Sequence, residues 1–165
     1  MIAAMGHVEV REAVAADREF VIDMVVAAAN WARTDRTREE TVADPDSAHY
    51  IEGWPRPTDI SVIATDGEIL VGAAFLRFFT EADPGYGFVR ADVPELAIGV
   101  VDGRRGQGVG KLLMRGVADA ARRAGLARIS LSVERTNTRA TTLYRAEGYQ
   151  VVEVGEHSDT MLIDL

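Results

Sequence analysis

The stretch that decides the fold is VVDGRRGQGVGKLL, residues 100–113. An apolar strand pattern ends in it, three glycines alternate with other residues after two arginines, and an apolar helical pattern follows. Glycines at such a turn let backbone N–H groups converge where a helix begins, and the positive end of the helix dipole adds to their field. The stretch therefore predicts an anion-binding turn between a strand and a helix.

Two familiar phosphate-binding loops do not fit this turn. A nucleotide P-loop needs glycine at the position of Arg105 and a hydroxyl residue at that of Leu112. The dinucleotide fingerprint needs glycine where Lys111 stands. A nucleotide-dependent enzyme and a glycine-rich turn without any ligand remain the alternatives at this point.

Charge is divided between this region and the rest of the chain. Residues 100–145 carry ten basic and three acidic side chains, a net charge of +7, whereas the remaining residues carry eight basic and 23 acidic ones, a net charge of −15. The basic segment coincides with the glycine turn and suits an anionic ligand, although mixed charge on solvated helix faces is an alternative. The overall charge of −8 argues against a nucleic-acid partner, which would need a basic face.

Length and composition indicate a single globular domain over residues 1–165. The chain has no cysteine, and its three histidines are far apart without a metal-ligand spacing, so we expect neither disulfides nor a metal site. The N-terminus becomes charged within a few residues, unlike a signal peptide, and no apolar run approaches the roughly 20 residues of a membrane span. We therefore expect a cytoplasmic protein without a membrane partner.

Hydrophobic patterns predict an α/β fold with a mixed sheet. Strands are predicted at 7–14, 60–65, 68–79, 95–101, 128–133, 149–154 and 160–165. Helical patterns are predicted at 17–31, 37–54 (irregular), 109–123 and 137–148. Asp66 and Gly67 form a two-residue hairpin turn in this prediction, and Asp17 and Asn137 are the expected N-caps of two helices. The predicted order is β-α-α-β-β-β-α-β-α-β-β, with helices on the faces of one sheet.

Two motifs resemble those of the GNAT family, the acetyl-CoA-dependent N-acetyltransferases. Residues 105–110, RGQGVG, match the family signature R/Q-x-x-G-x-G/A, which also follows an apolar strand. Residues 137–149, NTRATTLYRAEGY, match a second signature, N-x-x-A-x-x-L-Y-x-x-x-G-F/Y. The element order is similar to that family along nearly the whole chain, so we expect the GNAT acyl-CoA N-acyltransferase fold. Asp102 departs from the pattern, since many members have proline there.

The resemblance implies that acetyl-CoA is the co-substrate. The N–H groups of the glycine turn would bind the pyrophosphate of coenzyme A, and the edge of the preceding strand would pair with its pantetheine amides. In this family the strands on either side of the thioester splay apart to admit it. The residues implied to contact coenzyme A are Ile98, Gly99, Val100, Val101, Arg105, Gly106, Gln107, Gly108, Val109, Gly110, Lys111, Asn137 and Tyr144.

Acetyl transfer to an amine needs a base, a group that stabilises the oxyanion and an acid for the leaving thiolate. Tyr144 matches the family's acid, and Glu95 resembles the glutamate that acts as base, often through water. The alternatives are that Tyr144 only packs on the sheet and that Glu95 is a surface carboxylate. A backbone N–H near residues 98–100 would stabilise the oxyanion. Ser132 stands where some protein N-terminal acetyltransferases carry a glutamate, which weakens an assignment to that branch.

The predicted function is transfer of an acetyl group from acetyl-CoA to a primary amine of a small molecule or peptide. A non-catalytic acyl-CoA-binding module is the alternative, and a homodimer is left open. We expect acceptor contacts from residues 30–54, from the loop at 80–94 and from the last strands, as the resemblance implies. Trp31, Tyr50 and Trp54 are candidate pocket walls, with core packing as the alternative. The acidic residues of the loop predict a preference for cationic amines: Glu81, Asp83 and Asp92.

Overall fold

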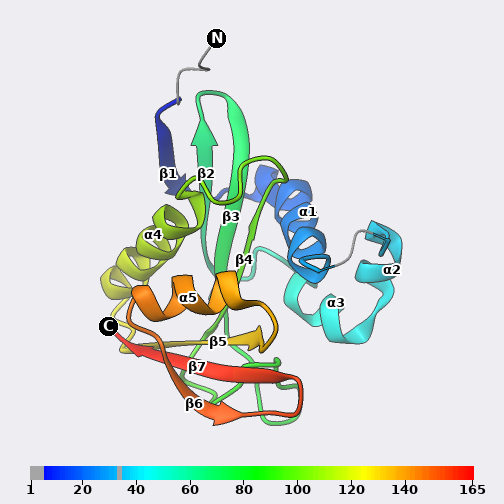
Figure 1. Cartoon of the computed structure of the whole chain (residues 1–165), viewed down its shortest axis with the longest axis vertical. Helices are drawn as coiled ribbons and strands as arrows, with labels where there is room; N and C mark the ends of the chain where they lie inside the picture. The colour runs from blue at the N-terminus through cyan, green and yellow to red at the C-terminus, as the bar shows by residue number, and fades with distance from the viewer. Residues whose placement is uncertain (1–5, 33–34) are drawn as a thin grey trace.

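The computed structural model describes residues 6–32 and 35–165. Within this part of the chain, one sheet has the strand order β1-β2-β3-β4-β5-β7-β6 (Figure 1). The strands are β1 (Val8–Glu12), β2 (Ile60–Asp66), β3 (Ile69–Arg77), β4 (Glu95–Val100), β5 (Arg128–Glu134), β6 (Gln150–Val154) and β7 (Ser158–Asp164). Neighbouring strands pair antiparallel except β4 and β5, which are parallel. The predicted mixed sheet and the hairpin are confirmed, but the two turn residues are Gly67 and Glu68, because Asp66 still pairs with Ile69 at the end of β2.

The helices are η1 (Ala15–Asp17, a 3-10 turn), α1 (Arg18–Ala29), α2 (Arg38–Ala43), α3 (Pro45–Ile51), α4 (Val109–Arg123) and α5 (Thr138–Ala146). The region predicted as irregular forms two helices, because Thr37 and Asp44 each cap a helix start with a side-chain oxygen. Pro45 follows Asp44 as the first residue of α3, where a missing backbone N–H has no consequence.

Asp17 occupies the N-cap position of α1, but the prediction that its side chain caps the helix is wrong. Asp17 is the last residue of η1, and its carboxylate accepts hydrogen bonds from the Val14 N–H at 2.8 Å and from the Arg11 guanidinium at 2.8 and 2.9 Å. Arg11 lies only six residues before Asp17, but hydrophobic periodicity and capping rules do not predict this ion pair. α1 therefore starts without a side-chain cap from this residue.

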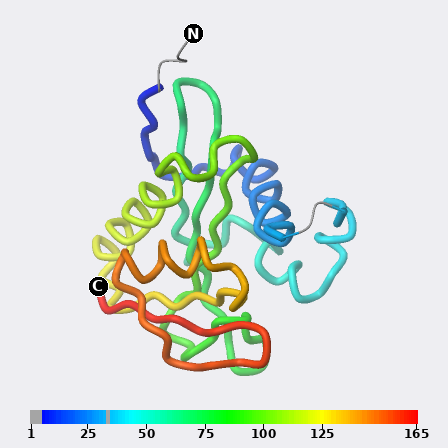
Figure 2. Tube along the Cα trace, in the orientation of Figure 1, coloured from blue at the N-terminus to red at the C-terminus, as the bar shows by residue number. Residues whose placement is uncertain are grey.

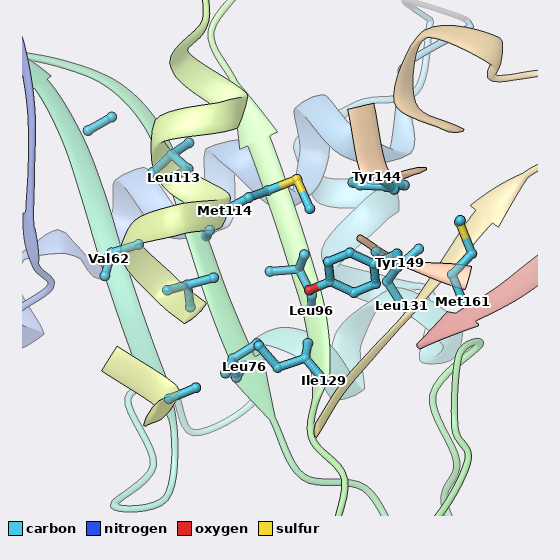
Figure 3. Close-up of a cluster of buried hydrophobic side chains, with 14 of the residues drawn as sticks. Val62, Leu76, Leu96, Leu113, Met114, Ile129, Leu131, Tyr144, Tyr149 and Met161 are labelled. Atoms are coloured by element: carbon cyan, nitrogen blue, oxygen red, sulfur yellow. The ribbon is translucent and has the colours of Figure 1, made fainter. Parts of the chain in front are cut away.

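Two hydrophobic clusters cover opposite faces of the sheet. On one face α4 packs Leu113 and Val117 against the strands, and α5 adds Tyr144 (Figure 3). On the other face α1 packs Val21 and α3 packs Ile51 against β2 and β3. Helices α4 and α5 thus share one face, and α1 and α3 share the other (Figure 1).

The parallel strands β4 and β5 pair at one position only. Glu95 is in register with Ser130, whose N–H donates to the Pro94 carbonyl at 3.0 Å. Beyond this pair the two strands separate (Figure 2), while β4 continues along β3. The Val101 N–H donates to the Val71 carbonyl of β3. Because the N–H groups of successive residues in a strand point to opposite edges, those of Ile98 and Val100 point away from β3 and toward the gap. The edge of β4 that faces β5 is therefore open at the gap.

Candidate functional site

A cleft of about 1160 Å³ occupies the gap between β4 and β5. Residues from both faces of the sheet line it: α4 and α5 contribute from one face, and α1 and α3 from the other. The cleft therefore joins the two faces at the point where the sheet is open.

The glycine turn forms one end of the cleft. Gly103, Gly106 and Gly108 have φ angles of +83°, +74° and +83°, a left-handed conformation that glycine adopts without strain. Gly108 is the N-cap of α4 and provides no side-chain cap. Within the described residues, the backbone N–H groups of residues 106–111 have no hydrogen-bond acceptor. The turn thus presents a cluster of free donors at the positive end of a 15-residue helix, which is an anion site.

Most residues predicted to contact coenzyme A line this one cleft: Ile98, Gly99, Val100, Arg105, Gly106, Gly108, Gly110, Lys111, Asn137 and Tyr144. Three others do not line it. The Val101 N–H is used by the Val71 carbonyl of β3, and the Val109 side chain is buried in the core. Gln107 is exposed and donates from its side chain to the Gly103 carbonyl at 2.8 Å.

Two polar side chains near the turn have defined partners. The Asn137 Oδ1 accepts from the Ala140 N–H at 3.2 Å and so caps α5, as predicted. Its Nδ2 group is a further donor on the wall of the cleft. The Arg105 guanidinium donates to the Val100 carbonyl at 3.3 Å and to the Ala27 carbonyl at 3.4 Å, which ties the turn to β4 and α1.

Tyr144 lines the cleft from α5 and is 9% exposed. Its ring lies beside that of Tyr149 with the centroids 6.1 Å apart (Figure 3). Burial raises the pKa of Tyr144 to about 12, so the phenol keeps its proton at neutral pH. Tyr144 can therefore donate a hydrogen bond or a proton to a group in the cleft.

Glu95 lines the same cleft from the opposite face of the sheet. Side chains alternate between the two faces of the sheet along β4: Leu96 packs in the cluster on the α4 face, and Ala97 packs against the cluster on the α1 face. Glu95 precedes Leu96 and therefore points to the same face as Ala97. Glu95 is only 3% exposed, so the alternative that it is a surface carboxylate is wrong. Burial raises the pKa of Glu95, although hydrogen bonds from Tyr50 and Gly87 oppose the shift.

The carboxylate of Glu95 is held by two donors. Its Oε1 accepts from the Tyr50 hydroxyl at 2.6 Å and from the Gly87 N–H at 3.0 Å. Its Oε2 is buried without a partner among the described residues. The Tyr50 hydroxyl in turn accepts from the Tyr86 N–H at 2.9 Å, so three segments meet at one carboxylate.

Tyr50 is a residue whose role sequence reasoning missed. The sequence predicts it as a candidate pocket wall or a core residue, and no local motif links it to a glutamate 45 residues away. Its ring stacks on Tyr86 at 6.5 Å and meets the edge of Phe79 at 5.0 Å. The one available signal was an aromatic residue on the helical region predicted to border the acceptor.

A buried ion pair fixes α3, which carries Tyr50. Arg77 of β3 and Asp59 have side chains 1% exposed, and they form two hydrogen bonds of 3.1 and 2.6 Å. The Arg77 guanidinium also donates to the His49 carbonyl at 3.1 Å and to the Glu52 carbonyl at 2.8 Å. Arg77 therefore attaches the C-terminal end of α3 to β3, and its charge is balanced by Asp59.

Charged side chains divide the cleft into two ends. We name the glycine-turn end by its basic residues Arg105, Lys111 and Arg139, since the Arg139 guanidinium lies beside Gly106. We name the carboxylate end by Glu95 and the lining residues connected to it, Tyr50, Tyr86 and Asp46. The division follows the sequence prediction of a basic segment facing an acidic remainder.

Some residues predicted for the acceptor side lie elsewhere. Glu81, Asp83 and Asp92 do not line the cleft, and Asp83 pairs with His49 at 3.0 Å. Trp54 is buried in the core at 3% exposure and donates to Ser61, so it is not a pocket wall. Trp54 instead packs in the hydrophobic cluster that contains Val21 and Ile63, as the alternative to a pocket wall predicted.

In residues 6–32 and 35–165, no group of three or more His, Asp or Glu side chains is placed to hold a metal ion. No helix in the same ranges is long and apolar enough to cross a membrane.

Similar proteins share this architecture. The sequence profile of the acetyltransferase (GNAT) family matches residues 25–149, while no curated protein sequence matches the chain. A GCN5-related N-acetyltransferase from Kribbella flavida is 26% identical with a TM-score of 0.66, covering 96% of this chain and 98% of that one. A ribosomal-protein-alanine N-acetyltransferase from Brucella melitensis is 23% identical with a TM-score of 0.70, over 95% and 99% of the two chains. The PaiA N-acetyltransferase of Thermoplasma acidophilum, solved in complex with coenzyme A, is 15% identical with a TM-score of 0.67, over 96% and 99%.

A mixed sheet that opens between two parallel strands, with a glycine turn leading into α4, defines the acyltransferase fold shared with these structures. The chain belongs to the GNAT acetyltransferase family. The relationship that the two sequence motifs indicated is confirmed.

Proposed function

We propose that the protein transfers the acetyl group of acetyl-CoA to a primary amine. The observation that carries this proposal is one cleft with a phenol, Tyr144, on one face of the sheet and a buried carboxylate, Glu95, on the other. A thioester in the gap would lie between an acid and a base, which is the arrangement that acyl transfer requires.

The glycine-turn end suits coenzyme A. Free N–H groups at the start of α4 can bind the pyrophosphate, and Lys111 and Arg139 add positive charge beside them. The open edge of β4 offers the N–H groups of Ile98 and Val100 to the pantetheine amides or to the thioester carbonyl. The coenzyme A complex of the Thermoplasma relative supports this assignment.

The chemistry follows from the positions of the two side chains. Glu95 is the final acceptor of one proton from the acceptor ammonium, and the neutral nitrogen attacks the thioester carbon to form the C–N bond. A backbone N–H at Ile98 or Val100 stabilises the oxyanion. The C–S bond then breaks, Tyr144 gives its proton to the sulfur, and the second nitrogen proton restores the phenol. One proton per turnover leaves through Glu95 to solvent.

The carboxylate end favours a cationic amine. Asp46 and Glu95 belong to it together with the aromatic rings of Tyr50 and Tyr86. A cation is attracted both by carboxylates and by the faces of aromatic rings. We therefore keep the predicted preference for cationic over acidic acceptors, with Asp46 and Glu95 replacing Glu81, Asp83 and Asp92 as the carboxylates that create it.

A panel of amines assayed by thiol release from acetyl-CoA tests the proposal. We expect steady release with cationic amines, and a loss of roughly 10²–10⁴-fold in kcat/KM for Glu95→Gln, the range that a positioned base contributes. Glutamine keeps an oxygen for the Tyr50 and Gly87 donors, so acetyl-CoA affinity should not change. Coenzyme A binding without thiol release for any amine would identify a non-catalytic module and overturn the proposal.

A further inference from the structure

Glu95 is too enclosed to meet an acceptor amine directly. Its Oε1 already accepts two hydrogen bonds, from Tyr50 and Gly87, which fills the two acceptor sites of that oxygen. Its Oε2 is buried, and Gly85 lies so close that a Cβ atom there would be 2.0 Å from this oxygen. A base at this position needs an intermediary that itself reaches the cleft.

The hydroxyl of Tyr50 has the required bonding capacity. A phenol oxygen can donate one hydrogen bond and accept two. Tyr50 donates to Glu95 Oε1 at 2.6 Å and accepts from the Tyr86 N–H at 2.9 Å, which leaves one acceptor site. Tyr50 also lines the cleft and is 9% exposed, compared with 3% for Glu95.

We propose that Tyr50 is the catalytic group that meets the acceptor ammonium and relays its proton to Glu95, an inference that rests on the proposed function. One N–H bond of the ammonium breaks and its proton goes to the Tyr50 oxygen, while the Tyr50 hydroxyl proton goes to Glu95 Oε1. The nitrogen keeps the electron pair for attack, Tyr50 is again a phenol, and Glu95 becomes a carboxylic acid.

The surroundings of the relay agree with this sequence of transfers. Burial and the neighbouring Glu95 carboxylate raise the pKa of Tyr50, so a free phenolate is disfavoured and the two transfers occur together. Burial also raises the pKa of Glu95, which brings its basicity closer to that of a catalyst working near neutral pH. Rings of Phe79 and Tyr86 hold the Tyr50 ring from both sides.

The test is Tyr50→Phe, which keeps the ring and its aromatic contacts but removes the oxygen. We expect kcat/KM for the amine to fall by about 10²-fold, the lower end of the general-base range, with acetyl-CoA affinity unchanged. Tyr149→Phe is the matched control: it also removes a buried phenol oxygen but does not line the cleft, and its activity should stay within about threefold of wild type.

Two further measurements separate a relay from packing. The Tyr50 hydrogen bond lowers the pKa of Glu95, so its removal should move the acid limb of the kcat/KM profile to higher pH. The double variant Tyr50→Phe with Glu95→Gln should be no slower than the slower single variant, because groups that act as a unit are not additive. A ring that only packs would leave the acid limb in place and give multiplicative losses.

The outcomes distinguish the two proposals. An active wild type whose Tyr50→Phe variant matches it in rate and pH profile overturns the relay and leaves the proposed function standing. A wild type that releases no thiol with any amine overturns the proposed function, and the relay with it.

Discussion

The two ends of the cleft are built in different ways. The glycine-turn end consists of consecutive residues, 106–111, whose backbone N–H groups are the binding atoms in the proposed function. The carboxylate end consists of side chains from α3, from the loop before β4 and from β4 itself, joined by hydrogen bonds such as Tyr50 to Glu95. A ligand common to a family can be held by backbone, which tolerates side-chain change, whereas the acceptor meets side chains that each member can vary.

Breaking the anchor of α3 should have the largest effect. Arg77→Met leaves the Asp59 carboxylate buried without its partner, and removing one member of a buried ion pair costs about 3–5 kcal/mol. Urea unfolding measures the loss, and Arg90→Met, which breaks an exposed pair with Asp92, is the control expected to cost less than about 1 kcal/mol. Equal losses in the two variants would show that the buried pair does not hold the carboxylate end together.

Tyr144→Phe tests whether Tyr144 is the general acid of the proposed reaction. We expect kcat to fall by about 10²-fold, the lower end of the range for a general acid, because thiolates leave fairly well unaided. Acetyl-CoA affinity, measured by calorimetry, should remain the same. Tyr149→Phe is the matched control, since its ring lies 6.1 Å away and does not line the cleft. Parent-like turnover in the Tyr144 variant across the pH range would restrict Tyr144 to packing.

Gly108→Val tests whether the backbone N–H groups at the start of α4 bind coenzyme A. A Cβ at Gly108 would meet nothing within 4 Å, so the penalty comes from its φ of +83°, which a branched residue adopts at a cost of about 1–2 kcal/mol. Relaxing that strain displaces the N–H groups, and we expect the Kd for coenzyme A to rise about tenfold or more.

Gly103→Val provides an unusually close control for this substitution. Gly103 has the same φ of +83° and the same open surroundings, but it does not line the cleft. Both variants should lose similar stability, and only Gly108→Val should lose coenzyme A affinity. Parallel losses of affinity would mean that the whole turn, not its helix-proximal N–H groups, sets binding.

Asp46→Asn should have the smallest effect. An exposed carboxylate at the cleft contributes less than about 1 kcal/mol, so we expect KM for a diamine to rise by about twofold to fivefold at low salt. The difference should shrink at high salt, while Glu153→Gln, an exposed residue outside the cleft, should change nothing. If an acidic amino acid and a diamine show equal efficiency at both salt concentrations, charge does not select the acceptor.

Elements that depend on interactions between residues close in sequence could be predicted from the sequence. α4 begins at Val109 and ends at Arg123, as its apolar stripe and flanking glycines indicate. The hairpin between β2 and β3 was predicted one residue too early but follows from the positive φ of Gly67, and Asn137 caps α5 through its own side chain. These features depend on residues within a few positions of one another, so one sequence contains the whole signal.

Side-chain contacts between elements could be predicted only in part. Asp17 was expected to cap a helix and instead pairs with Arg11 of β1, whereas Trp54 packs in the core, the stated alternative to a pocket wall. The hydrogen bond from Tyr50 to Glu95 joins α3 to β4 across 45 residues. Such contacts depend on how helices pack on the sheet, which periodicity and capping rules do not specify.

The open edge of β4 has a consequence for how the backbone exchanges hydrogen with solvent. Ala97 and Gly99 are in register with β3 and are protected by the sheet, whereas the N–H groups of Ile98 and Val100 face the gap. Deuterium uptake in the free protein should therefore alternate between slow and fast from one residue to the next along this six-residue strand. A substrate that pairs with the edge acts as the missing strand, and the alternation disappears as the site fills.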